Sequence, residues 1–301
     1  MTEELRLAAF LAARPRLLRL AYRYLQTVSE AEDVVQDCWL RFSAAAIPDD
    51  CESYLARIVT RLCLDRLKSA THRRETYVGP WLPEPLAGAT EPAGDTALDI
   101  SFAVMRALET LSPLERAALF LHDLFDVPFE EIAETLDRSP AACRQLAARA
   151  RKSIRQDGRR FAASRADVDR FVDGMENAIR TGDLAPLQSL LTADIELVSD
   201  GGGKALAARN ILRGADAVSR FLLGVSRFVE RERLAIEPAT INGAPGLLIL
   251  IDGAVNQTMS FAVDDAGAVT GIYAVRNPDK LEAVRAAAGG GPGDGSGAGA
   301  G

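Results

Sequence analysis

Basic side chains are concentrated between residues 138 and 160, where eight lysines and arginines accompany a single aspartate. Arg144, Gln145, Arg149 and Lys152 fall on one face if this stretch is helical. Guanidinium and carboxamide groups form paired hydrogen bonds with the edges of guanine and adenine, and lysines contact phosphates. The spacing therefore predicts a helix that reads the major groove of DNA.

The residues just before this helix predict the turn that would position it. With Phe129 as the first position of a helix-turn-helix, the inward-facing positions hold Ile132, Ala133, Leu136, Cys143 and Leu146. Asp137 stands where the turn needs a left-handed backbone, which Asp tolerates better than most residues. Ser139 and Pro140 supply an N-cap and a first-turn proline. An ordinary helical hairpin with a basic face is the alternative, and it would not require this spacing.

A second basic block lies about seventy residues earlier. Between residues 57 and 74, six basic residues accompany only Asp65, although the 301-residue chain has a net charge of −7. Acidic residues gather instead at 30–37 and 123–137, and residues 166–301 carry most of the negative charge. Two basic blocks predict two anion-binding surfaces, with solvated helix faces as the alternative.

Residues 2–74 have apolar side chains at three- and four-residue spacing, which predicts helices throughout. We expect one helix to start at an N-cap Ser29, with Glu32 as its capping-box partner, and another to start at Ser53. Residues 75–98 contain seven prolines and glycines, which predicts a flexible linker. Helical periodicity resumes at residue 99 and continues to about residue 161.

From residue 167 the pattern changes to helices followed by short strands. Helices are expected at 168–181 and 184–191, and strands at 195–199, 234–241, 247–251, 255–263 and 269–275. Asn242-Gly243 and Asp252-Gly253 are typical of turns between antiparallel strands. This order predicts an α+β domain at 167–285, with helices on one side of a curved antiparallel meander. The glycine-rich residues 289–301 predict a disordered tail.

Three motifs together resemble a known family. The run from Ser29 to Arg41 resembles the acidic helix of extracytoplasmic-function sigma factors, the small bacterial initiation factors of RNA polymerase. The helix from Ser53 to Arg74 resembles their segment that reads and melts the minus-ten promoter element. Residues 111–116 with the helix-turn-helix resemble their module for the minus-thirty-five element. The motifs occur in the family's order, which implies a multidomain chain with two all-α sigma domains at 1–74 and 99–163.

The resemblance implies a role for each motif. Core RNA polymerase would bind through its beta-prime clamp coiled coil and its beta flap, and the candidate contacts in this chain are Asp33, Gln36, Asp37, Trp39 and Arg41. The candidate contacts to the minus-ten element of promoter DNA are Arg57, Arg61, Arg66, Lys68, Arg73 and Arg74. Those to the minus-thirty-five element are Ser139, Arg144, Gln145, Arg149, Arg151, Lys152 and Arg155.

Three further stretches are similar to the sigma-factor group with a fused SnoaL-like extension, a cone-shaped α+β fold shared with nuclear transport factor two. They are Trp81, Leu82, Pro83, Glu84 and Pro85; Asp200, Gly201, Gly202, Gly203 and Lys204; and Asn277, Pro278, Asp279, Lys280 and Leu281. The resemblance implies an extension that adjusts sigma activity in cis, without a membrane-bound anti-sigma partner. We expect the second and third stretches to lie together and to touch the linker around Trp81.

Two functions from other classes are alternatives to a sigma factor. The SnoaL-like fold also hosts enzymes, but both histidines, His72 and His122, lie outside 167–285, and no partner group accompanies a carboxylate such as Asp200 or Asp252. We therefore expect no enzymatic activity, while a pocket for a small-molecule ligand stays open. A one-component regulator would bind DNA through the helix-turn-helix alone, and would leave the acidic helix unexplained.

The cysteines and the hydropathy of the chain argue against metal-binding, disulfide-linked, membrane and secreted proteins. The four cysteines, Cys38, Cys51, Cys63 and Cys143, form no C-x-x-C pair, so we expect no metal, no cofactor and no disulfide scaffold. No stretch approaches the roughly 20 apolar residues that span a bilayer, and the first thirty residues lack the pattern of a secretory signal. The sequence predicts a cytoplasmic protein without a membrane partner.

Overall fold

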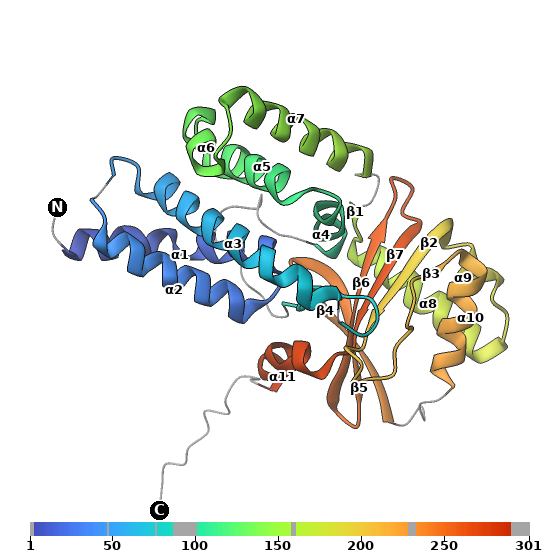
Figure 1. Ribbon diagram of the computed structural model, residues 1–301. Coiled ribbons are helices and arrows are strands. Elements are labelled where there is room, and N and C mark those ends of the chain that lie inside the picture. Colours follow the sequence, from blue (N-terminus) through green and yellow to red (C-terminus); the bar gives the residue numbers. More distant parts are fainter. Residues whose placement is uncertain are drawn as a thin grey trace, which may run out of the picture. The chain divides into compact units, whose positions relative to one another are not determined.

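The computed structural model describes residues 3–46, 48–75, 77–86, 101–157, 161–227 and 233–289 (Figure 1). The chain forms two compact units. Unit 1 contains Met1–Tyr77, Trp81–Glu84 and Phe102–Phe161, and unit 2 contains Val78–Pro80, Pro85–Ser101 and Ala162–Gly301. The second half of the predicted linker, from residue 87 onwards, and the predicted tail beyond Gly289 lie outside the described residues.

The described part of unit 1 consists of helices and their connections. Its helices are α1 (Glu3–Leu25), α2 (Val28–Ala44), α3 (Cys51–Glu75), α4 (Phe102–Glu109), α5 (Pro113–Phe125), α6 (Phe129–Leu136) and α7 (Pro140–Asp157). Helix α1 packs on α2 and α3, α5 packs on α7, and α3 also packs on α5. Apolar side chains at helical spacing form the core of the α1–α3 bundle, among them Leu17, Leu20, Val34, Phe42, Leu55 and Val59, all at most 1% exposed.

The predicted N-cap of α2 is wrong, because the helix begins at Val28 and Ser29 lies within it. Thr27 stands at the N-cap position and makes no side-chain cap bond. Instead, the backbone N–H of Val28 donates to a carboxylate oxygen of Glu84 at 2.6 Å. A carboxylate is favoured there because the first N–H groups of a helix carry partial positive charge. Rules that use neighbouring residues could not find this cap, which comes from 56 positions along the chain.

Helix α3 also starts earlier than predicted. One carboxylate oxygen of Asp50 accepts from the backbone N–H groups of Glu52 and Ser53, both at 3.1 Å, and the helix begins at Cys51. Ser53, predicted as the start, donates its hydroxyl to the other oxygen of Asp50. The predicted start of the helix was two residues too late, because Asp and Ser both favour the N-cap position.

The predicted helix-turn-helix is confirmed in α6 and α7. Asp137 has φ +53° at the end of α6, and the Ser139 hydroxyl accepts from the backbone N–H of Ala142 at 3.2 Å. The five predicted inward-facing side chains are all buried, with exposures of 0–8%: Ile132, Ala133, Leu136, Cys143 and Leu146. The residues of the turn and the buried apolar face of α6 and α7 therefore both indicate the helix-turn-helix.

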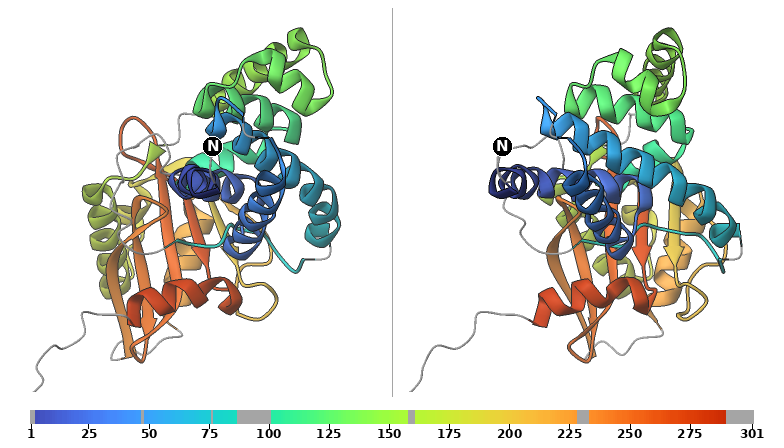
Figure 2. Two further views of the ribbon diagram at one scale, coloured as in Figure 1. Left: turned by 90° about the vertical axis from the view of Figure 1, so that its left-hand side faces the viewer. Right: turned by 60° about the vertical axis from the view of Figure 1, so that its left-hand side comes forward.

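Unit 2 is an α+β fold built on one mixed sheet. Its strands are β1 (Phe161–Ala162), β2 (Leu191–Asp200), β3 (Leu212–Arg213), β4 (Leu234–Ile241), β5 (Ala244–Ile251), β6 (Ala254–Val263) and β7 (Val269–Val275). The order is β3-β2-β7-β6-β5-β4, with β1 paired to β6. Helices α8 (Arg165–Thr181), α9 (Ala185–Gln188) and α10 (Ala215–Ser226) pack against it (Figures 1 and 2), and a short 3-10 helix, η3 (Pro278–Leu281), leads into α11 (Glu282–Gly289).

The sheet differs from the predicted meander in one pairing, since β2 and β7 are parallel. A parallel pair joins segments that are distant in sequence, so turn residues give no sign of it. Strands β4 to β7 do form an antiparallel meander, and the turns at Asn242-Gly243 and Asp252-Gly253 have positive φ at both residues. Helices α10 and α11 were not predicted. No helix in the described part of the chain is both long and apolar enough to cross a membrane.

Candidate functional site

The predicted DNA-reading helix carries arginines that are paired with carboxylates of neighbouring helices. The Arg144 guanidinium lies 2.8 Å from Glu130 and over the ring of Phe129, with its carbon 5.5 Å from the ring centroid. Arg149 pairs with Glu115 at 3.2 Å. Both arginine side chains remain more than half exposed. These pairs hold the guanidinium groups at the surface, where an incoming phosphate or base edge competes with a carboxylate.

The other predicted contacts of α7 have different environments. Arg151 is directed toward α5, where it forms two hydrogen bonds with the carboxylate of Asp123. Gln145 and Lys152 are exposed, and Ser139 caps the helix. The side chain of Arg155 lies outside the described residues. The exposed face of α7 thus combines an amide, an ammonium and two surface-held guanidinium groups.

The first half of the predicted minus-ten helix is covered by α6. Arg57 of α3 lies 2.8 Å from a carboxylate oxygen of Glu131. Arg61 donates to the backbone carbonyl oxygens of Glu134 at 2.9 Å and Thr135 at 3.4 Å. Two of the side chains predicted to touch DNA are therefore occupied by partners within unit 1.

Arg66, further along α3, links the predicted minus-ten helix to α2, the predicted polymerase-binding helix. Its guanidinium lies 3.0 Å from Asp37 and 3.5 Å from Asp33 on α2. Lys68 pairs with Asp65 of its own helix at 2.9 Å and is 77% exposed. The side chains of Arg73 and Arg74 lie outside the described residues. Lys68 is therefore far more accessible to an anionic partner than Arg57 and Arg66, whose side chains are 20% and 29% exposed.

Helix α2 presents an acidic face and an aromatic anchor. Asp33 and Asp37 are 65% and 47% exposed, and Gln36 and Arg41 are exposed too. The Trp39 ring packs instead on α1, with its centroid 5.0 Å from that of Phe10. Trp39 therefore holds the two helices together, while the charged and amide groups remain available to a protein partner.

A buried ion pair joins the second and third family-like stretches. Lys280 lies 2.7 Å from a carboxylate oxygen of Asp200, and the two side chains are 5% and 0% exposed. The backbone oxygen of Asp200 accepts from the N–H groups of Arg276 at 2.7 Å and Asn277 at 2.9 Å. A second pair, Lys204 with Asp279, lies at the surface. The two stretches lie together, as expected from the sequence.

The three glycines after Asp200 form a tight turn. The Gly201 carbonyl accepts from the N–H groups of Lys204 and Ala205, both at 3.0 Å, and a side chain at Gly201 would meet the Ala205 oxygen at 2.4 Å. Gly202 donates its N–H to the Asp200 carboxylate. These N–H groups bond within the loop. The loop therefore serves as a connection after β2 rather than as a cradle for a phosphate.

Each unit holds a part of the predicted linker. Within unit 1, Leu82 and Pro83 are buried, Trp81 lies against Tyr77 with ring centroids 4.7 Å apart, and Glu84 caps α2. Within unit 2, the Leu86 N–H donates to the Asn242 side-chain oxygen at 3.0 Å, and Asn242 N–H donates to the Leu86 oxygen at 2.8 Å.

The start of the linker touches the glycine turn of unit 2. A Cβ atom at Gly203 would lie 3.1 Å from the Cβ of Val78. The loop was expected to approach the linker around Trp81, and the contact found within unit 2 is three residues earlier. Asn242 was not predicted as a linker contact, since its only local signal in the sequence is the Asn-Gly turn.

Comparison with known proteins decides the family. Residues 9–73 match Sigma-70 region 2, and residues 101–154 match Sigma-70, region 4. The chain is 41% identical over 286 residues to the ECF RNA polymerase sigma factor SigJ of Mycobacterium tuberculosis (strain ATCC 25618 / H37Rv), covering 90% of this chain and 92% of SigJ. The chain belongs to the extracytoplasmic-function sigma factors of RNA polymerase.

Two further similarities cover almost the whole sigma factor. It is 31% identical over 298 residues to the probable ECF sigma factor SigI of Mycobacterium tuberculosis (strain CDC 1551 / Oshkosh), covering 94% of this chain and 97% of SigI. The crystal structure of Mycobacterium tuberculosis SigJ matches with a TM-score of 0.70 and 35% identity, covering 92% of this chain and 98% of that one. The mixed sheet of unit 2 is consistent with a SnoaL-like fold. These similarities support a sigma factor over a one-component regulator.

Proposed function

We propose that this sigma factor binds core RNA polymerase through the exposed face of α2, formed by Asp33, Gln36, Asp37 and Arg41. The support is the combination of acidic charge and exposure on a helix whose opposite side is buried through Val34, Cys38 and Phe42. The beta-prime clamp coiled coil is the proposed partner of this face, and the beta flap the proposed partner of the region 4 helices. Charge complementarity at such a face raises the rate of association and sets orientation.

A charge reversal on α2 tests this assignment. Asp33→Arg combined with Asp37→Arg should weaken binding of the full chain to core polymerase by at least about tenfold, since like charges across an interface cost several kcal/mol. Asp65→Arg on α3 is the control, because Asp65 is 66% exposed, like Asp33, but pairs only within its own helix. Equal binding by the double variant and the control would exclude α2 as the contact.

We also propose that the described arrangement of unit 1 is a resting state for promoter binding. Arg57 and Arg61 of α3 are engaged by α6, and Arg144 and Arg149 of α7 by carboxylates. Promoter DNA must replace these partners, so the proposed active state has α3 separated from α6. If only a small fraction of the molecules is in the active state, the apparent affinity for promoter DNA is the affinity of the active state multiplied by that fraction.

The linker is the proposed route by which unit 2 influences this equilibrium. Glu84 caps α2 in unit 1, and Leu86, two residues later, is held by Asn242 in unit 2. The stretch from Glu84 to Leu86 is held at both ends and therefore cannot extend. It connects the two DNA-binding modules, region 2 and region 4, which need freedom to separate. Unit 2 would therefore restrain the factor in cis. Transcription by a full chain with a weakened Leu86–Asn242 contact tests this proposal.

A regulatory rather than catalytic role is proposed for unit 2. The relatives that match across nearly the whole chain are named as sigma factors. Within the described residues, no cluster of His, Cys, Asp and Glu side chains forms a site for a metal ion. Because its proposed partners are RNA polymerase and promoter DNA, the proposed place of action is the cytoplasm.

A further inference from the structure

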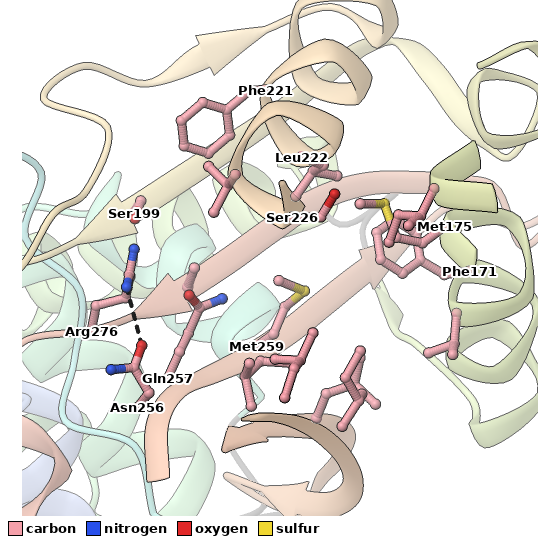
Figure 3. A pocket seen from close by; sticks show the side chains of 18 of the residues that line it. Phe171, Met175, Ser199, Phe221, Leu222, Ser226, Asn256, Gln257, Met259 and Arg276 are labelled. Carbon is pink, nitrogen blue, oxygen red and sulfur yellow. Dashed lines mark hydrogen bonds between the residues drawn. The ribbon is translucent and has the colours of Figure 1, made fainter. Parts of the chain in front are cut away.

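A cavity of about 150 Å³ lies inside unit 2, between the sheet and helices α8 and α10 (Figure 3). Its walls are mostly apolar, with Phe171 and Met175 from α8, Phe221 and Leu222 from α10, and Met259 from β6. An apolar cavity of about 150 Å³ is large enough for one six-membered ring. The walls therefore favour a compact hydrocarbon body and disfavour a sugar or a nucleotide.

One end of this cavity is polar. Figure 3 shows Arg276, Asn256, Gln257 and Ser199 gathered at that end, away from Phe171 and Met175. The Arg276 guanidinium donates to the Asn256 side-chain oxygen at 3.1 Å and to the backbone oxygen of Leu206 at 2.6 Å. Both acceptors are neutral groups, so hydrogen bonds hold the guanidinium in place without cancelling its charge.

Arg276 has unused capacity for an anion. Its Nε atom is buried and has no hydrogen-bond partner among the described residues, and no carboxylate of those residues forms an ion pair with it. Burial lowers the pKa of Arg276. The carboxylate that lines the cavity, Glu176, is exposed on α8 and directly follows Met175 in the sequence. A half-buried guanidinium without a counter-ion is costly, and a bound anion would relieve that cost.

We infer that the cavity binds a small monocarboxylate with an apolar ring or branched chain, with its carboxylate on Arg276 and its body against the Phe171–Met259 wall. A planar carboxylate matches two N–H groups of one guanidinium. A phosphate would bring more negative charge than one arginine balances. An uncharged hydrocarbon would fill the walls but leave the Nε atom of Arg276 unpaired.

The polar end of the cavity adjoins the buried ion pair. The backbone N–H of Arg276 donates to the backbone oxygen of Asp200, and its side chain donates to the backbone oxygen of Leu206 in the loop that follows Asp200. A ligand on Arg276 would therefore fix the segments on both sides of the Asp200–Lys280 pair. The binding site stands on its own geometry, whereas any effect of the ligand on transcription rests on the proposed function of unit 2.

Calorimetric titration of the full chain with benzoate and benzamide tests the site without polymerase. The two probes have the same ring and nearly the same size but differ in charge. We expect benzoate to bind at least about tenfold more tightly than benzamide, because hydrogen bonds between two charged groups are stronger than those between a charged and a neutral group. Arg276→Gln should remove this preference while benzamide binding persists.

Two further variants control for folding and for general charge. Arg220→Gln removes an arginine that pairs with Asp216 on the surface of α10, so it should bind benzoate like the unmodified chain. Ile249→Trp fills the cavity from β5 and should abolish binding of both probes, with the folded state checked by circular dichroism. Equal affinity for the two probes, absence of binding, or equal behaviour of Arg276→Gln and Arg220→Gln would overturn the inference.

Discussion

The ammonium of Lys280 and the carboxylate of Asp200 form an ion pair at 2.7 Å that is almost completely shielded from water. The same two segments are joined by Lys204 and Asp279, whose side chains are 57% and 58% exposed. Two Lys–Asp ion pairs thus connect the end of β2 and the loop after it with the 3-10 helix η3, and one pair is buried while the other is exposed. This contrast allows the contribution of burial to be measured directly.

Lys280→Met should destabilise the folded chain strongly. Removal of one partner leaves the Asp200 charge buried, which costs about 3–5 kcal/mol, whereas loss of an exposed pair costs about 0–1 kcal/mol. Lys204→Met is therefore the matched control. Urea unfolding of the full chain, followed by circular dichroism, measures the free energy of unfolding of both variants. Similar losses for the two variants would show that Asp200 finds compensation elsewhere.

Arg144→Ala should weaken promoter binding by the holoenzyme by about 1–3 kcal/mol, the usual range for a paired contact with a base. Lys152→Ala should weaken binding to all sequences alike and reduce the salt slope by about one unit, as expected of a phosphate contact. Binding to a selected promoter and to a scrambled duplex at several salt concentrations separates the two effects. Equal loss on both duplexes for Arg144→Ala would contradict base reading.

Glu130→Gln should have the opposite effect and strengthen binding of the holoenzyme to DNA. Glu130 holds Arg144 at 2.8 Å, and the neutral amide competes less well with a phosphate or a base edge. The gain should be small, up to about 1 kcal/mol, because the pair is exposed. The same titrations measure it. A loss of affinity would mean that Glu130 orients Arg144 for DNA instead of competing for it.

The capping box of α5 predicts a pH dependence. Hydrogen bonds from Ser112 lower the pKa of Glu115, and the nearby Arg149 contributes as well. Because this pKa is lower in the folded chain, the stabilisation is complete above the unfolded value of about 4.3 and is lost as the pH falls through the folded value.

Ser112→Ala should therefore cost about 1 kcal/mol of unfolding free energy at pH 7, and less below pH ~4. Ser139→Ala is the control, because Ser139 caps α7 without a carboxylate partner in the cap. Its cost should not change with pH in this range. Parallel pH profiles for the two variants, measured by urea unfolding, would refute the assigned origin of the shift.

The predictable parts of this protein are those fixed by neighbouring residues. Asp137, Ser139 and the buried face of α6 and α7 could be placed from the sequence because turn chemistry and apolar spacing act over a few positions. Strands β4 and β7 were predicted with their observed bounds for the same reason.

The unpredicted features depend on distant partners. Glu84 caps a helix that starts 56 residues earlier, and Asn242 contacts Leu86 across 156 positions. The carboxylates on Arg57 and Arg144 also come from other helices, so exposure of the predicted DNA contacts could not be judged from charge alone. The family resemblance identified the stretches around Asp200 and Lys280, but burial of their ion pair needed the fold.

Promoter-specific run-off transcription with purified core RNA polymerase tests the proposed restraint by unit 2 most directly. Asn242→Gly keeps the positive-φ turn but removes the oxygen that accepts from Leu86. Loss of one hydrogen bond, about 1 kcal/mol, would shift a two-state equilibrium about fivefold. Asp252→Gly alters the neighbouring turn, which has the same backbone conformation and pairs with Arg233 instead. We predict severalfold more transcript with Asn242→Gly than with the unmodified chain or Asp252→Gly; equal or lower yield from Asn242→Gly would contradict the restraint.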